Sequence, residues 1–340
     1  MEVEWYSTTM RQINFLIFIL VFSCVIPVPA LAFEKIFYFN NSKAGLESLK
    51  KNADKIDILA PQSYSVSAKM VPSGSLSKEV KKIAADYNIQ IMPLIVNSGF
   101  NKEVMHKLLI TPSAQQAVIA YMVLTALREK YIGWQFDFEH IAHTDRDLYS
   151  EFAEKTATEF KKHGLILSIA AVARKNDEVT EAYKNWGGVY DYERLVKSVD
   201  FISIMTYDDP DSKKSTASIP YLHEVYTYLK DKIPPAKLSL GIPFYYWQWS
   251  VEESPKRSTG VHSKIATIKS LYPNAIEGFD TTLRVPWLAY IKNGIPYIVW
   301  HENTESFMEK INFAKKYNLR GYSAWVLGAE HPDMWMTADL

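Results

Sequence analysis

The stretch GWQFDFEHI, residues 133–141, alternates bulky apolar side chains with polar ones at the period of a β-strand. In an extended chain its three aromatic side chains point to one face. The opposite face carries Gln135, Asp137 and Glu139. Burying two carboxylates without partners is costly, so this face must border a space that tolerates charge. The stretch therefore predicts a strand packed on one side and lined with acids on the other.

Eight short apolar runs alternate with amphipathic stretches along the chain. The predicted strands are residues 36–39, 56–60, 89–96, 134–139, 165–172, 201–207, 238–244 and 322–327. The predicted helices between them include residues 113–130, 145–163, 190–198, 221–229 and 304–317. Strands that alternate with helices form a parallel sheet, and eight such strands close into a barrel. We therefore predict an α/β fold, a (β/α)8 TIM barrel.

The spacing of the predicted strands is regular up to the seventh. Roughly 75 residues then pass before the eighth, and they contain a helical pattern at 264–271 and a strand pattern at 297–300. We predict a small α+β insertion at about residues 247–303 of a single barrel domain that covers residues 33–340.

The composition excludes some classes of partner. Of the 340 residues 48% are hydrophobic, and the formal net charge is zero. Without an overall basic field, nucleic acid is not an expected partner. We expect a monomer that binds a neutral or only locally charged ligand.

The N-terminus has the features of a secretory signal peptide. Arg11 precedes the apolar run 15–26, and Ala30-Leu31-Ala32 forms a small-x-small cleavage site before Phe33. We predict a signal peptide at residues 1–32 and a secreted, periplasmic or cell-envelope protein without stable membrane insertion after cleavage. A transmembrane anchor and lipidation of Cys24 are the alternatives. Cys24 is the only cysteine, so the cleaved chain would have no disulfide and no thiol nucleophile.

In a barrel, the acidic face of the opening strand would point inward, with Asp137 and Glu139 nearest the C-terminal rim, where barrel enzymes hold their active sites. Inward-facing neighbours on one strand are roughly 6–7 Å apart. Two carboxylates at this distance raise each other's proton affinity. One of them is expected to keep a proton near neutral pH, as a general acid requires.

Four motifs, in order along the chain, carry a resemblance. They are IGWQFDFE (132–139), MTYD (205–208), GIPFY (241–245) and GYSAWVLG (321–328). With these motifs the chain resembles glycoside hydrolase family 18, the chitinase-like barrels, whose fourth strand ends in Asp-x-x-Asp-x-Asp-x-Glu. The last two acids match and the first two do not, because Ile132 stands in the first position and Gln135 stands where that pattern has its middle acid. Bacterial cell-wall and spore-lytic members are similar in carrying an amide there.

The resemblance implies a retaining hydrolase that cleaves β-1,4-linked N-acetylglucosamine-containing glycan with help from the substrate's own 2-acetamido group. Glu139 would protonate the glycosidic oxygen, and Asp137 would hold the acetamido N–H. Tyr207 would aim the acetamido carbonyl, and Trp325 would form the floor under the sugar. No cofactor or metal is implied.

Further residues are expected to bind substrate. Gln135 would hydrogen-bond Asp137 without taking its charge, so that activity survives with an altered acid limb of the pH profile. Asp208 and Tyr245 fall in the matched motifs. Tyr64 and Asn97, together with Gln62, fall at the ends of the second and third strands, where they would face the substrate.

Other interpretations stay open at this point. A non-catalytic glycan-binding protein of the same fold is the main alternative, although such lectins usually lose the acid equivalent to Glu139; a barrel hydrolase for another sugar is a further one. The acids could also form structural ion pairs. The insertion's tryptophans would line a glycan groove or pack together: Trp247, Trp249, Trp287 and Trp300. The substrate would be peptidoglycan or chitin, with the amide at position 135 favouring peptidoglycan.

Overall fold

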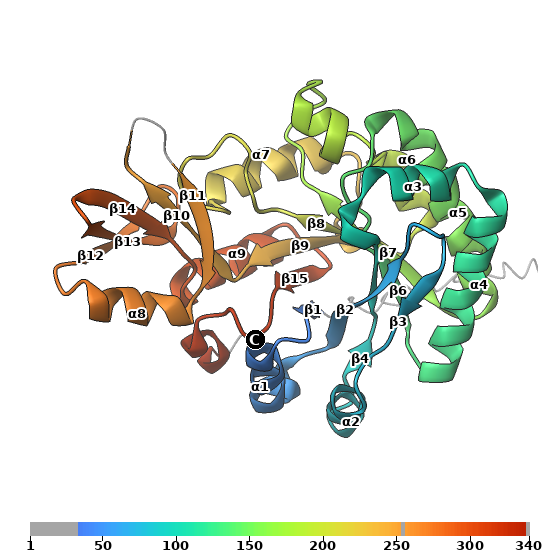
Figure 1. Cartoon of the computed structure of the whole chain (residues 1–340), viewed down its shortest axis with the longest axis horizontal. Coiled ribbons are helices and arrows are strands. Elements are labelled where there is room, and N and C mark those ends of the chain that lie inside the picture. Colours follow the sequence, from blue (N-terminus) through green and yellow to red (C-terminus); the bar gives the residue numbers. More distant parts are fainter. Residues whose placement is uncertain (1–32, 253–255, 338–340) are drawn as a thin grey trace, which may run out of the picture. The chain divides into compact units, whose positions relative to one another are not determined.

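The computed structural model describes residues 33–252 and 256–337, so the predicted signal peptide lies outside the described residues. Eight parallel strands form a closed barrel (Figure 1). They are β1 (Glu34–Phe39), β2 (Ile58–Val66), β5 (Leu94–Asn97), β6 (Gly133–Phe136), β7 (Ile166–Val172), β8 (Phe201–Met205), β9 (Leu238–Pro243) and β15 (Gly321–Trp325). The barrel closes because β1 pairs with both β2 and β15. The predicted TIM barrel is confirmed.

Two strands differ from the predicted ones. The third predicted strand is divided into β4 (Gln90–Ile91) and β5, with Met92 and Pro93 between them. The strand is interrupted at Pro93, because proline has no N–H to donate to the hydrogen-bond ladder of the sheet. The second strand is longer than expected, since β2 continues into an antiparallel pairing with β3 (Pro72–Gly74).

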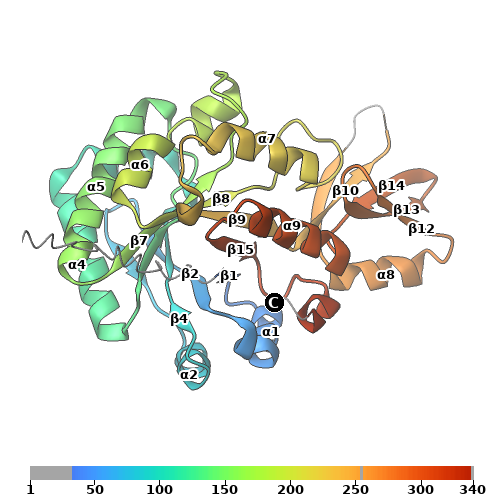
Figure 2. The ribbon, with the colours of Figure 1, turned by 180° about the vertical axis from the view of Figure 1, so that it is seen from behind.

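Helices surround the barrel (Figures 1 and 2). They are α1 (Lys43–Asn52), α2 (Lys78–Asp86), α3 (Lys102–Leu109), α4 (Pro112–Glu129), α5 (Arg146–Lys162), α6 (Tyr192–Ser198), α7 (Ile219–Leu229) and α9 (Thr304–Lys316). Six begin at a Ser, Asn or Asp whose side chain accepts a hydrogen bond from the first turn. Among the described residues no single helix is long and apolar enough to cross a bilayer; only α3 and α4 together, bent by 99° at their junction, match in length and composition.

The opening strand, β6, has the predicted two faces. The indole N–H of Trp134 donates to the backbone oxygen of Met122 in α4, at 2.9 Å. Phe136 stacks on Phe152 of α5, with ring centroids 5.2 Å apart. Gln135 points the other way, into the barrel, where it is fully buried. The aromatic face therefore attaches the strand to the helices, and the polar face is left for the interior.

A hydrogen-bonded layer of small polar side chains fills the barrel interior below the rim. We call it the hydroxyl belt; it consists of Gln135, Ser168, Ser203, Ser239 and Ser323, all at most 1% exposed. The Gln135 amide donates to Ser168 and Ser203 at 3.0 and 3.1 Å. Ser323 joins Ser203 to Ser239 at 2.9 and 2.7 Å. The belt links five strands by side chains as well as by the backbone ladder.

A second sheet stands between β9 and β15 in the sequence. Its order is β11 (Arg257–Val261), β10 (Tyr245–Ser250), β14 (Ile295–Trp300), β13 (Val285–Lys292) and β12 (Ile276–Asp280), and α8 (Ser263–Leu271) packs with it. It has a small apolar core of its own around Leu288 and Val299. The sheet begins at Tyr245, two residues before the insertion expected from sequence. It brings Tyr245 to the rim of the barrel.

Candidate active site

A cavity of about 440 Å³ lies at the C-terminal ends of the barrel strands. Six of the predicted site residues line it: Asp137, Glu139, Tyr207, Asp208, Tyr245 and Trp325. Its walls also include Tyr38, Gln62, Trp186 and Met205, and Thr259 and Val261 from the second sheet. Residues from many separate strands and loops thus meet around one space large enough for a sugar ring.

Asp137 is 4% exposed at the floor of this cavity. Burial, and then the negative charge of Glu139, raise the pKa of Asp137 to about 7. The Gln62 amide donates to Asp137 Oδ2 at 3.0 Å, which partly offsets this rise. Asp137 is therefore poised between its neutral and ionised forms near neutral pH.

Glu139 is partly buried beside Asp137. Burial raises the pKa of Glu139, and the negative charge of Asp208 adds to the rise. The Trp186 indole N–H donates to Glu139 Oε2 at 2.8 Å and acts in the opposite direction. Both acids thus have the raised proton affinity expected from the sequence, but burial, more than their mutual repulsion, is its main cause. A carboxyl whose pKa is raised is better suited to serve as a general acid than one at its ordinary value.

The remaining aromatic groups of the cavity contact one another in pairs. Tyr207 packs edge-on against Tyr245, with centroids 6.1 Å apart and planes at 85°. Trp325 lies against Tyr38 at 5.3 Å and keeps part of its surface exposed. Asp208 follows Tyr207 in a left-handed conformation, at φ +59°, which Asp tolerates better than most residues. Burial raises the pKa of Asp208 as well.

Asn97 does not line the cavity, in contrast to the prediction. It is fully buried, and its side-chain oxygen accepts a hydrogen bond from the backbone N–H of Glu139 at 3.1 Å. Its amide donates to the backbone oxygen of Glu139 and to that of Asn101, both at 3.0 Å. Asn97 therefore fixes the backbone that carries Glu139 and faces no substrate.

Tyr64 also lies away from the cavity, so its predicted role in binding is wrong. Its ring packs edge-on against Trp134, with centroids 4.8 Å apart, and its hydroxyl bonds that of Tyr131 at 2.9 Å. The cause is a register shift in β2 between Gln62 and Tyr64. One extra residue there reverses the alternation, so Gln62 faces the cavity and Tyr64 faces the helices.

Gln135 lies beneath the cavity and makes no hydrogen bond to Asp137, contrary to expectation. Its oxygen accepts from the Tyr38 hydroxyl at 2.8 Å, and its amide binds the belt serines. The amide that contacts Asp137 comes from Gln62 instead. Gln135 thus supports the floor of the cavity through Tyr38 and does not contact the acid.

The family model for glycosyl hydrolases family 18 matches residues 29–330. This chain belongs to that family. It is 26% identical over 268 residues to the cortical fragment-lytic enzyme of Bacillus subtilis, a match covering 76% of this chain and 61% of that enzyme. It is also 26% identical over 163 residues to the human di-N-acetylchitobiase, a match covering 40% of this chain and 42% of that protein.

Solved structures share the fold of this family 18 glycoside hydrolase. The spore cortex-lytic enzyme SleL of Bacillus megaterium QM B1551 superposes with a TM-score of 0.80 at 20% identity, covering 89% of this chain and 72% of that one. A chitinase of Chromobacterium violaceum ATCC 12472 gives a TM-score of 0.80 at 22% identity, covering 90% and 97%. The likeness thus covers about nine tenths of this chain.

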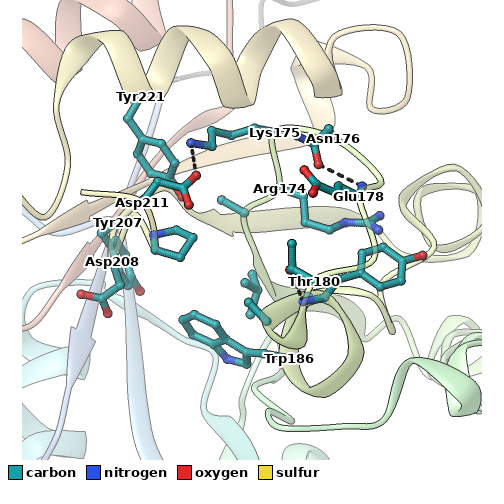
Figure 3. Close-up of a pocket in the computed structure, with 16 residues that line it drawn as sticks. Arg174, Lys175, Asn176, Glu178, Thr180, Trp186, Tyr207, Asp208, Asp211 and Tyr221 are labelled. Atoms are coloured by element: carbon teal, nitrogen blue, oxygen red, sulfur yellow. Dashed lines mark hydrogen bonds and ion pairs between the residues drawn. The ribbon is translucent and has the colours of Figure 1, made fainter. Parts of the chain in front are cut away.

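A side cavity of about 210 Å³ opens beside the acids of this family 18 enzyme and shares Trp186, Tyr207 and Asp208 with the main cavity (Figure 3). It lies between the segments that follow β7 and β8. Lys175 bridges these segments by ion pairs to Asp211 at 2.6 Å and to Asp209 at 3.6 Å. These ion pairs join the two segments that border the side cavity.

Sequence reasoning did not identify Trp186 or Tyr38 as site residues. Tyr38 lies in the first strand within a run of apolar residues. In the sequence, only its hydroxyl group distinguishes it from its apolar neighbours. Trp186 belongs to a π-helical turn, Tyr183–Gly187, that no periodic pattern marks. For Gln62 the sequence correctly predicted a side chain that faces the cavity, but it did not predict the hydrogen bond to Asp137.

Proposed function

We propose that this family 18 enzyme hydrolyses a glycan with β-1,4-linked N-acetylglucosamine and retains the anomeric configuration through catalysis by the substrate's acetamido group. The single observation that carries the proposal is that Asp137 and Glu139 border one cavity together with Tyr207 and Trp325. A sugar ring stacked on Trp325 would place its acetamido group near the tyrosine and its glycosidic oxygen near the acids.

In the first half-reaction, Glu139 gives its proton to the glycosidic oxygen as the bond to the anomeric carbon breaks. The acetamido carbonyl oxygen forms the new bond to that carbon, giving an oxazolinium ion and the free alcohol of the departing sugar. Asp137 accepts the acetamido N–H and offsets the positive charge on the ring. The Tyr207 hydroxyl donates to the acetamido carbonyl and aims it.

In the second half-reaction, the Glu139 carboxylate takes a proton from water, and the water oxygen bonds to the anomeric carbon from the face that the leaving group vacated. The bond to the acetamido oxygen breaks, and the acetamide is restored. Two inversions at one carbon give net retention. Glu139 ends the cycle protonated, and each turnover consumes one water molecule and one glycosidic bond.

Support for peptidoglycan as the substrate comes from the relatives. Several are named cortical fragment-lytic enzymes, and another is named a putative sporulation-specific glycosylase. Chitinases superpose equally well, so chitin is the alternative polymer. The apolar run at 15–26 followed by Ala30-Leu31-Ala32 supports export to the compartment where these polymers occur.

The test is digestion of purified peptidoglycan, chitin oligomers and cellulose oligomers side by side, with product masses and the initial anomer read by mass spectrometry and NMR. We expect β-anomeric N-acetylglucosamine ends, no cleavage of cellulose oligomers, and loss of turnover by roughly 10²–10⁴-fold in Glu139→Gln. Binding without turnover by the unmodified enzyme would instead support a lectin. Cleavage of glucans without acetamido groups would refute assistance by the substrate.

A further inference from the structure

Trp186 contacts the proposed general acid from a segment outside the barrel. It lies in the π-helical turn Tyr183–Gly187, after β7, and donates its indole N–H to Glu139 Oε2 at 2.8 Å. Its ring lies nearly parallel to the imidazole of His140, with centroids 6.0 Å apart and planes at 11°. Among residues 33–252 and 256–337, this is the one hydrogen bond made to the Glu139 carboxyl group.

We propose that Trp186 is a positioning residue that fixes which oxygen of Glu139 carries the catalytic proton. The inference rests on the proposed function, because it assumes that Glu139 is the general acid. It assigns Oε2 to the indole and Oε1 to the substrate.

The assignment follows from the chemistry of the two groups. An indole N–H donates and cannot accept. In a protonated carboxyl group, the carbonyl oxygen is the good acceptor and the hydroxyl oxygen carries the proton. With the indole N–H held on Oε2, the favoured form of the acid therefore has its proton on Oε1. A rotation of the carboxyl group that exchanged the oxygens would leave the indole facing a hydroxyl.

The same contact serves both halves of the reaction. When Glu139 has given up its proton, the hydrogen bond becomes charge-assisted and stronger, which stabilises the carboxylate against burial. Oε1 is then the free oxygen that takes the proton from water. Oε1 of Glu139 thus donates the proton in the first half-reaction and accepts one in the second. The carboxyl group does not have to rotate between them.

The backbone of Glu139 is held independently. Asn97 accepts from its N–H at 3.1 Å and donates to its carbonyl oxygen at 3.0 Å. With Asn97 at the main chain and Trp186 at Oε2, the residue is fixed at three atoms. Oε1 is the remaining polar atom, and Glu139 borders the cavity.

The first experiment compares Trp186→Phe with the wild-type enzyme over a range of pH. Phe keeps a flat ring against His140 and removes the donor. We expect kcat to fall by roughly tenfold to a hundredfold, with a smaller change in KM, because one hydrogen bond to a charged group is lost. The pKa of Glu139 rises without the donor, so the basic limb of kcat/KM moves to higher pH.

The matched control is Trp134→Phe, which also removes an indole N–H, here one that donates to the backbone oxygen of Met122 in α4 at 2.9 Å, on the helix-facing side of β6. It should leave the pH profile unchanged. Urea unfolding of both variants shows that each is folded. If Trp186→Phe is folded but has the wild-type kcat and the wild-type basic limb, the proposal is overturned.

A second measurement needs no turnover. In ¹H–¹⁵N NMR spectra, the Trp186 indole resonance, identified by its absence in Trp186→Phe, should shift with pH as Glu139 ionises, and most of that shift should vanish in Glu139→Gln. An indole that titrates in an enzyme inactive on N-acetylated glycans would overturn the proposed function alone. An indole that does not titrate in an active enzyme would overturn the positioning role alone.

Discussion

Replacing Asp137 with Asn should stabilise the protein at alkaline pH, although it removes a proposed catalytic group. Asp137 is 4% exposed, and its carboxylate shares a cavity with that of Glu139. Asn has nearly the same shape and can still accept the hydrogen bond that the Gln62 amide gives to Asp137 at 3.0 Å. The change therefore removes a buried charge and leaves the packing in place.

The magnitude follows from the pKa of Asp137, which is about 7 in the folded protein against an ordinary value of 3.8. Between these two values the folded protein holds a proton that the unfolded chain has released. The free energy of unfolding therefore falls as pH rises through this window, and the stabilising effect of the neutral form is fully present only below it. About three pKa units correspond to about 4 kcal/mol lost by pH 8. The Asp137→Asn variant does not lose this free energy of unfolding, because the Asn side chain does not ionise.

The assay is urea unfolding of wild-type protein and Asp137→Asn at pH 4, 6 and 8. The variant should match the wild type near pH 4 and exceed it progressively, by up to about 4 kcal/mol at pH 8. Asp54→Asn, at an exposed position after α1, is the control and should show no such gain. An equal difference at all three pH values, or a variant less stable at pH 8, would refute the account of Asp137 as a buried carboxyl with a raised pKa.

Three further substitutions test the arrangement of the site. Gln135→Leu should lower the free energy of unfolding by about 2–4 kcal/mol in urea denaturation, because Tyr38 and two belt serines lose their partner. Tyr64→Phe should keep kcat/KM within about twofold of wild type, whereas Tyr207→Phe should lower it by roughly tenfold or more; equal losses would contradict the placement of Tyr64. Trp325→Ala should raise KM for N-acetylglucosamine oligomers on the order of tenfold, measured by initial rates, since the sugar loses its apolar floor; an unchanged KM would place the sugar elsewhere.

The barrel and the two acids could be predicted because they depend on local periodicity. In β6 and the residues that follow it, alternation alone separates the aromatic face from the acidic one, and the structure confirms both. The same reasoning gave Gln135 its inward direction. It could not give the partner, because Tyr38 and the belt serines come from other strands, and their pairing depends on how the barrel closes.

The errors have equally specific causes. Tyr64 was assigned to the wrong face because a one-residue register shift in β2 leaves no mark in the composition of the strand. Asn97 reaches the end of its strand as predicted, but its side chain bonds backbone atoms 42 residues away. Trp186 meets Glu139 across 47 residues from an irregular turn. Contacts of this range follow from the assembled fold and not from any repeat in the sequence.

The hydroxyl belt places a layer of neutral but orientable dipoles beneath the floor of this site. Its serine side chains carry no charge, and each hydroxyl can either give or receive a hydrogen bond by turning about one bond. In the proposed reaction, positive charge grows on the sugar and Glu139 loses its proton, and a hydroxyl below can answer such a change by turning its O–H while its oxygen stays in place. The belt can thereby respond to a charge that develops above it, without an ionised group of its own and without a shift of the strands that carry it.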